Sequence, residues 1–194
     1  MSRIHQEIIS SWVLPDSSVL DLGCGDGELL TRLIREKQVR AQGIELSEQA
    51  IHQCVSGGLS VFQEDIDTGI AEFADESFDY VILNQTFQQV KKPDFVLQEA
   101  LRVGKKSIVC FPNFVHFRAR FQIFFNGRVP VTSALPFDWY DTPNLHFLSI
   151  ADFIEYCGKR RVRIEQAEYI RGDRKVRFLP NLFAETGLFL LSKS

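Results

Sequence analysis

Apolar residues in the first 112 positions follow two spacings, one typical of helices and one typical of strands. Those of residues 4–12 and 29–34 recur every three or four positions, which predicts helices. Short apolar runs lie between and after them and predict strands. Strands are expected over 18–22, 41–46, 59–62, 78–83 and 107–111, with further helices from Ser47 and over 93–102. This alternation predicts an α/β fold with a doubly wound, mostly parallel sheet.

The pattern changes after Pro112. Residues 113–148 are rich in aromatic side chains and contain several turn signals, so regular buried elements are not expected there. We expect an insertion or cap after the fifth strand, with one helix near 115–125. The turn signals are Asn126-Gly127, Pro130, Pro136 and Pro143.

Regular patterning returns at Ser149. An aspartate, Asp152, follows it three residues later, which resembles a capping box and predicts a helix that runs through Tyr156. Two further strands are expected near 161–170 and 187–191. They would complete a seven-stranded sheet.

Charge and cysteine spacing narrow the classes of partner. The net charge of −3 gives no broad positive field, so nucleic acid and anionic membranes are not favoured. The four cysteines, Cys24, Cys54, Cys110 and Cys157, form no CxxC pair, which argues against a structural zinc site or a disulfide framework, and no metal site is predicted. No apolar run reaches the length of a membrane span, and the N-terminus lacks a long apolar segment. We expect a cytoplasmic location.

A glycine-rich loop joins the first expected strand to a helix. Gly23, Gly25 and Gly27 have the order GxGxG, and glycine there permits positive φ and close approach of a ligand. Glu28 stands where a dinucleotide loop has its third glycine, and Asp21 precedes the loop. An acid at the loop entrance repels a pyrophosphate but suits the cationic amino-acid end of S-adenosylmethionine. The loop therefore favours a ligand other than NAD.

Acidic residues follow the next two strands as well. Glu45 lies at the end of the second strand, where it can accept hydrogen bonds from ribose hydroxyls, although NAD sites use the same device. Asp65 follows the third strand and can accept from an adenine amine, while Ile66 packs on the ring. The alternative is that these are solvated strand ends. Together with Asp21 they predict a nucleoside-binding edge at the carboxyl ends of the sheet.

The motifs VLDLGCGDG, GIELS, EDI and FDYVILNQTFQQV occur in this order and resemble those of class I S-adenosylmethionine-dependent methyltransferases. The resemblance implies that S-adenosylmethionine or S-adenosylhomocysteine binds through residues 21–27, 45, 46, 65, 66 and 84. It thus adds Cys24, Leu46 and Asn84 to the cofactor-binding set, although Cys24 is expected to act as a small packing residue. A single domain over 1–194 is expected, with a cofactor-binding half (1–112), an insertion (113–148) and a C-terminal helix and strands (149–194).

The segments FPNF and ALPFDWYDTPNLHFLS, at 111–114 and 134–149, are similar to the MetW family of methionine-biosynthesis proteins. This resemblance implies a role in methionine biosynthesis in support of a homoserine O-acyltransferase. The alternative is an active methyltransferase with an unidentified small-molecule acceptor. The fold alone does not choose between an enzyme and a regulatory subunit.

Candidate catalytic residues come from the aromatic segment. His116, Tyr140, Asp141 and His146 place hydrogen-bonding groups among apolar rings, which suits either a pocket or a partner surface. The two histidines could act as general bases. Methyl transfer, however, often depends mainly on in-line placement of the nucleophile, and a lone histidine is more often structural. The catalytic residues therefore stay open.

Residues 159–177 are locally basic, which raises nucleic acid as a methyl acceptor. Glu165, Glu168 and Asp173 interrupt the basic run, and no RNA-reading motif accompanies it. A solvated face of two antiparallel strands is the favoured interpretation. Nucleic-acid methylation is therefore less favoured than a small acceptor.

Overall fold

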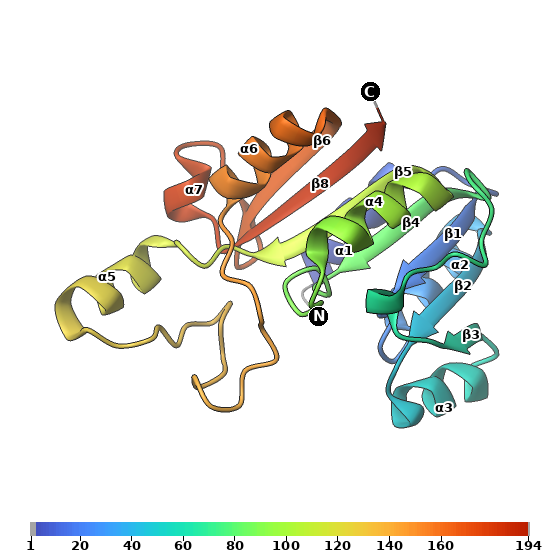
Figure 1. Ribbon diagram of the computed structural model, residues 1–194, viewed down its shortest axis with the longest axis horizontal. Helices are drawn as coiled ribbons and strands as arrows, with labels where there is room; N and C mark the ends of the chain where they lie inside the picture. The colour runs from blue at the N-terminus through green and yellow to red at the C-terminus, as the bar shows by residue number, and fades with distance from the viewer. Residues whose placement is uncertain (1–2, 194) are drawn as a thin grey trace.

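The computed structural model describes residues 3–193, and an eight-stranded sheet of order β3-β2-β1-β4-β5-β8-β6-β7 lies at its centre (Figure 1). The expectation of a domain over 1–194 thus includes Met1, Ser2 and Ser194, which lie outside the described residues. The parallel strands are β1 (Ser18–Leu22), β2 (Arg40–Glu45), β3 (Ser60–Gln63), β4 (Phe78–Asn84) and β5 (Gly104–Pro112). The antiparallel strands are β6 (Val162–Arg171), β7 (Arg174–Lys175) and β8 (Thr186–Lys193). The predicted α/β class and mostly parallel sheet are confirmed.

The prediction of seven strands is wrong by one. The extra strand is the two-residue β7, which pairs with the end of β6 through Arg171 opposite Arg174. Gly172, with φ of 54°, turns the chain between them. Two residues are too few to produce an alternating pattern, so hydropathy did not reveal this hairpin.

Helices cover both faces of the sheet. On one face the buried residues of α1 (Arg3–Trp12), α2 (Glu28–Lys37) and α3 (Glu48–Ser56) pack in one apolar cluster, which includes Ile9 and Leu30. On the other face, α4 (Pro93–Val103) and α6 (Ile150–Arg160) share a second apolar cluster. Figure 1 shows these two helices on the same side of the sheet. Burial on two faces explains the largely apolar runs of the central strands β4 and β5.

The capping box predicted at Ser149 is confirmed. The Ser149 hydroxyl accepts the Asp152 N–H at 3.1 Å, and the Asp152 carboxylate accepts the Ser149 N–H at 3.0 Å. The helix continues past Tyr156 to Arg160, because Cys157 is still buried against the sheet. Arg161 then ends it in a left-handed conformation.

The chain leaves the sheet after β5 and returns at α6. Helix α5 (Phe117–Asn126) begins and ends slightly later than predicted and stops at Gly127, whose φ is 60°. We call residues 117–147 the aromatic arm; in Figure 1 its helix and following loop extend away from the sheet. The Gln122 amide closes the arm on itself through hydrogen bonds to both backbone groups of Val131.

Two short elements complete the structure. They are η1 (Ile66–Thr68), a single 3₁₀ turn after β3, and α7 (Pro180–Phe183), which precedes β8. Within residues 3–193 there is no helix both long and apolar enough to cross a lipid bilayer.

Candidate functional site

The glycine loop after β1 adopts backbone angles that favour glycine. Gly23, Gly25 and Gly27 have φ of 78°, 55° and 75°. The loop is fixed to β2, because the N–H groups of Gly23 and Cys24 both donate to the Ile44 carbonyl, at 2.8 and 3.1 Å. A Cβ on Gly27 would lie 2.2 Å from a Leu59 methyl carbon. Position 27 therefore needs glycine both for its positive φ and for lack of space.

The Glu45 carboxylate holds the loop at the end of β2. One oxygen accepts the Gly25 N–H at 2.8 Å, and the other accepts the N–H groups of Leu46 and Ser47 at 2.8 and 3.0 Å. A carboxylate has about four lone-pair directions, so room remains for a further donor. Sequence reasoning assigned Glu45 to ribose; the structure adds that it organises the loop itself.

Asp21 lies in β1 beneath the loop and is 2% exposed. Its Oδ1 has no hydrogen-bond partner among the described residues. Burial, and secondly the charge of Glu45, raises the pKa of Asp21 to about 7. A cationic ligand group near the loop would favour the ionised form of this carboxyl.

We expect Asp21→Asn to stabilise the ligand-free protein at high pH. The pKa of Asp21 rises from 3.8 to about 7 on folding, so the folded state holds the proton more tightly. The stability that this provides is present below about pH 4 and is lost as pH rises through 7. Relative to the native protein, the variant should gain on the order of 2 kcal/mol between pH 5 and 8 in urea unfolding. A gap that does not change with pH would contradict the shift.

A cavity of about 440 Å³ opens at the carboxyl ends of the first four parallel strands. Seven predicted cofactor residues line it, whereas Asp21, Cys24 and Gly27 do not. Those three lie behind its wall, as parts of the loop and of β1. The seven are Gly23, Gly25, Glu45, Leu46, Asp65, Ile66 and Asn84.

Sequence reasoning missed the remaining residues of this lining. Most of them flank predicted positions in QEDID and NQTFQQV, which was the available signal. Gln85 has a φ of 61°, a conformation that no sequence pattern announced. Asp67 fixes the next loop, because its carboxylate accepts the N–H groups of Lys91 and Lys92 at 2.9 and 2.8 Å. The missed residues are Ile44, Glu64, Asp67, Gln85, Thr86, Gln89 and Val90.

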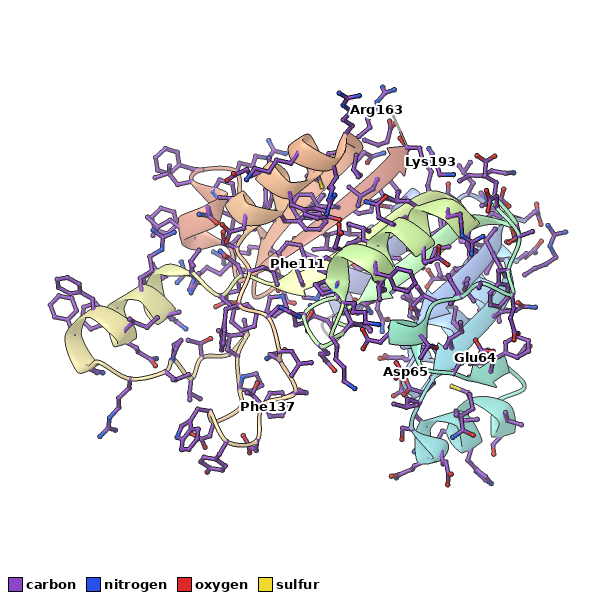
Figure 2. All side chains as sticks on the ribbon, viewed as in Figure 1. Glu64, Asp65, Phe111, Phe137, Arg163 and Lys193 are labelled. Carbon is purple, nitrogen blue, oxygen red and sulfur yellow. The ribbon has the colours of Figure 1, made fainter. Side chains whose placement is uncertain are left out.

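The cavity is acidic. Four carboxylates line it, those of Glu45, Glu64, Asp65 and Asp67, and no Lys or Arg is among its described lining residues. Figure 2 shows Glu64 and Asp65 together on the segment that follows β3. Such a site attracts a cation and repels a pyrophosphate.

The four catalytic candidates do not meet at this cavity. His116 is 2% exposed, and burial lowers its pKa. Tyr140 and Asp141 are exposed in the aromatic arm, where the Tyr140 hydroxyl donates to Asp138 at 3.2 Å. The His146 N–H donates to the Gln88 carbonyl at 3.1 Å. None of the four lines the cavity, so no catalytic role is assigned to them.

The cysteines are buried and free. Burial raises the pKa of the Cys24 thiol far above its ordinary range, which agrees with a packing role. The Cys54 thiol donates to the Gly25 carbonyl at 3.2 Å and so supports the glycine loop. Residues 3–193 contain no cluster of His, Cys, Asp and Glu arranged to hold a metal ion.

Acidic partners offset the basic C-terminal stretch. Lys175 pairs with Glu168 at 2.6 Å, and Arg163 pairs with Glu165 at 3.1 Å. The guanidinium of Arg171 lies 5.0 Å from the ring centroid of Phe117.

Comparison with known proteins identifies the family. A family model described as "Methionine biosynthesis protein MetW" matches residues 3–191. The chain belongs to the MetW family. It is 35% identical over 200 residues to the "Bifunctional methionine biosynthesis protein MetXA/MetW" of Rhodopirellula baltica. The match covers 96% of this chain and 32% of that protein, so the MetW chain spans about a third of its relative's length.

Solved structures share the fold of this MetW family member. An S-adenosylmethionine-dependent methyltransferase from Mesorhizobium loti matches with a TM-score of 0.71 and 15% identity, over 97% of each chain. One from Archaeoglobus fulgidus matches with a TM-score of 0.68 and 13% identity, over 97% of this chain and 94% of that one. At these identities the likeness shows the fold alone.

Proposed function

We propose that this MetW family member binds S-adenosylmethionine or S-adenosylhomocysteine in the acidic cavity and supports a homoserine O-acyltransferase in methionine biosynthesis. The observation that carries the nucleoside assignment is the combination of a GxGxG loop with a lining that has four carboxylates and no described Lys or Arg. A sulfonium and an ammonium group suit that charge, whereas the diphosphate of NAD does not.

The residues of the cavity have separate roles in this proposal. Glu45 fixes the glycine loop and accepts from the ribose. Asp65 accepts from the adenine amine. Ile66, which follows it in the chain after β3, packs on the ring. Asp65 is preorganised, because its Oδ1 already accepts the Asp67 N–H at 2.9 Å. When bound, S-adenosylmethionine supplies an electrophilic methyl group.

The domain organisation of a relative supports homoserine O-acyltransferase as the partner. The Rhodopirellula baltica protein is named as bifunctional MetXA/MetW, and this chain matches about a third of it. Where two such units share one chain, covalent linkage keeps them close. For this chain, we assign the contact with the acyltransferase to the aromatic arm.

The arm exposes an unusual set of apolar side chains. Trp139 and Tyr140 are 73% and 70% exposed and lie edge to face, 5.7 Å apart. Trp and Tyr are the residue types most enriched at binding hot spots, and exposed apolar clusters mark interaction sites. Figure 2 shows Phe137 on the same loop, outside the sheet. The other exposed aromatics of the arm are Phe121, Phe124, Phe125, Phe137 and Phe147.

A second candidate function is methyl transfer to a small acceptor. It is favoured by one observation: another cavity adjoins the first and shares Gln85 and Gln89 with it. An acceptor there would approach the nucleoside across these two residues. Nucleic acid fits less well, because both cavities are acidic.

Isothermal titration calorimetry tests the nucleoside assignment. We expect S-adenosylmethionine and S-adenosylhomocysteine to bind with measurable heat and NAD to show none at the same concentrations. The reason is the acidic lining, which penalises a diphosphate. If NAD bound more tightly than both, the proposed nucleoside site would be wrong.

A further inference from the structure

Four arginines lie where the aromatic arm leaves the sheet, and none of them forms an ion pair with an acidic residue within 3–193. Other basic residues of the C-terminal stretch do form such pairs, with Lys175 bonded to Glu168 and Arg160 to Asp94. The difference marks the four as a group, which we call the arginine cluster. Its members are Arg118, Arg120, Arg171 and Arg174.

Contacts bring three of these arginines together. Arg118 and Arg171 both lie over the ring of Phe117, with guanidinium carbons 5.9 and 5.0 Å from its centroid. Arg174 stands directly opposite Arg171 in the β6–β7 hairpin. Side chains at opposite positions of an antiparallel pair are neighbours, and like charges there destabilise the pair. The cluster therefore gathers positive charge at a cost that an anionic partner would offset.

The fourth arginine, Arg120, connects the cluster to helix α7. Its guanidinium donates to the Asn181 carbonyl at 3.2 Å, so its acceptor is a neutral group. Figure 1 shows α5 and α7 at the same end of the molecule. The ring centroid of Phe183 lies 6.0 Å from that of Phe117 and 6.4 Å from that of Phe178, which is 73% exposed. An exposed apolar ring thus lies beside the arginines.

Acidic residues near the cluster do not balance its charge. Asp173 lies in the turn of the hairpin, and Glu185 lies just before β8. The Glu185 carboxylate accepts the Gly172 N–H at 3.0 Å and the Ser133 hydroxyl at 3.1 Å, and it pairs with no described arginine. Four arginines against two acids leave a positive surplus here, although the whole chain has a net charge of −3.

This combination of groups fits a protein segment better than a nucleic acid. Guanidinium groups bind carboxylates in a fixed geometry, and arginine and aromatic residues are enriched at protein interfaces. A long polyanion would also approach the acidic cavity at the strand ends and a chain of net negative charge. A short acidic segment would meet only the cluster.

We propose that the arginine cluster docks an acidic segment of a protein partner. Carboxylates of the segment pair with the exposed Arg118 and Arg174, and an apolar side chain next to them packs on Phe178. None of these residues lines the nucleoside cavity, and the surface uses neither Trp139 nor Tyr140. The inference therefore goes beyond the proposed function and does not depend on it.

Fluorescence anisotropy of a labelled peptide of alternating glutamate and leucine, titrated with the full chain, tests the proposal. We expect a Kd of about 0.1 mM at about 0.1 M salt, and weaker binding as added salt screens the charges. A peptide with lysine in place of glutamate should not bind, and one with serine in place of leucine should bind about tenfold more weakly. Equal binding of the lysine peptide, or no binding of the acidic peptide at about 1 mM, would overturn the proposal.

Charge-reversal variants locate the surface. Arg118→Glu and Arg174→Glu should each weaken binding of the acidic peptide about tenfold. Arg40→Glu is the matched control, because Arg40 is an exposed arginine of β2 that lies outside the cluster and forms no ion pair among the described residues. An equal loss in the Arg40 variant would show attraction by overall charge and reject the docking surface. Phe178→Ala should weaken binding of the leucine peptide but not of the serine peptide.

Two further titrations separate this inference from its alternatives. If a single-stranded oligouridylate of the same charge bound more tightly than the peptide and lost binding in the arginine variants, the cluster would be a nucleic-acid site and the proposal would be overturned. S-adenosylhomocysteine should bind the arginine variants as it binds the native protein. Loss of peptide binding alone supports a separate docking surface, whereas peptide binding without any nucleoside binding would overturn only the proposed nucleoside site.

Discussion

Glu45→Ala should weaken S-adenosylhomocysteine binding by about 1–3 kcal/mol, roughly 5- to 150-fold in Kd. The variant removes the acceptor of three backbone N–H groups, from Gly25, Leu46 and Ser47, and with it the proposed acceptor for ribose. Loss of the loop contacts and loss of the ribose contact both weaken binding. A loop that is no longer held in place must be ordered when the ligand binds, and the entropy of ordering it lowers the affinity. Calorimetric titration of the folded variant measures the effect.

Two further variants make the Glu45 result specific. Glu48→Ala removes a nearby carboxylate in the first turn of α3 that does not line the cavity, and it should leave affinity unchanged. Asp65→Ala should cost less than Glu45→Ala, because Asp65 holds only one backbone N–H near the cavity. Native affinity in well-folded Glu45→Ala protein would remove this residue from the site.

Trp139→Ala combined with Tyr140→Ala should abolish the proposed complex with homoserine O-acyltransferase. Hot-spot aromatics typically contribute 2 kcal/mol or more each to binding, so the pair corresponds to a loss of roughly a thousandfold in Kd. The free protein should lose little stability, because both side chains are more than two-thirds exposed. Co-purification of the two proteins and the acyltransferase rate measure the first effect, and thermal unfolding measures the second.

A core role for the two aromatics predicts the opposite pattern. Each truncation would then cost roughly 3–5 kcal/mol of stability. Leu14→Ala is a suitable control, because Leu14 is 64% exposed and lies outside the arm. A large fall in melting temperature with an intact complex would reject the arm as the docking surface, and so would an equal loss of binding in the Leu14 variant.

The sequence predicted the first half of the fold well, because each buried element there has a clear hydropathy period. Strand β4, for example, is a nearly continuous apolar run between two helical layers. The later elements were harder to predict. Strand β7 has two exposed residues, and α7 is a four-residue turn before β8, so neither has a periodic apolar face.

The candidate site likewise has a part that sequence patterns predicted and a part that they did not. Acidic residues at strand ends were predicted from spacing, since the carboxyl ends of parallel strands meet at one edge. Sequence spacing could not show that the Glu45 carboxylate turns back on its own loop or that Gln85 takes a left-handed conformation. The catalytic candidates were chosen by residue type alone. His116 proved buried and Tyr140 exposed, because the path of an irregular segment is set by tertiary contacts.

The backbone of Gln88 connects the aromatic arm to the β4–α4 loop. Its backbone carbonyl accepts hydrogen bonds from the backbone N–H groups of Leu145 and His146, at 2.9 and 3.1 Å. These two bonds hold the arm against the β4–α4 loop. Gln85 and Gln89 of that loop line the proposed nucleoside cavity. Suppose that binding of an acyltransferase to the arm changes the affinity of the protein for the nucleoside by some factor. Thermodynamic linkage then requires nucleoside binding to change the affinity for the acyltransferase by the same factor. The ratio of S-adenosylmethionine to S-adenosylhomocysteine in the cell would then help to set how much of the complex exists, provided that the complex distinguishes the two molecules.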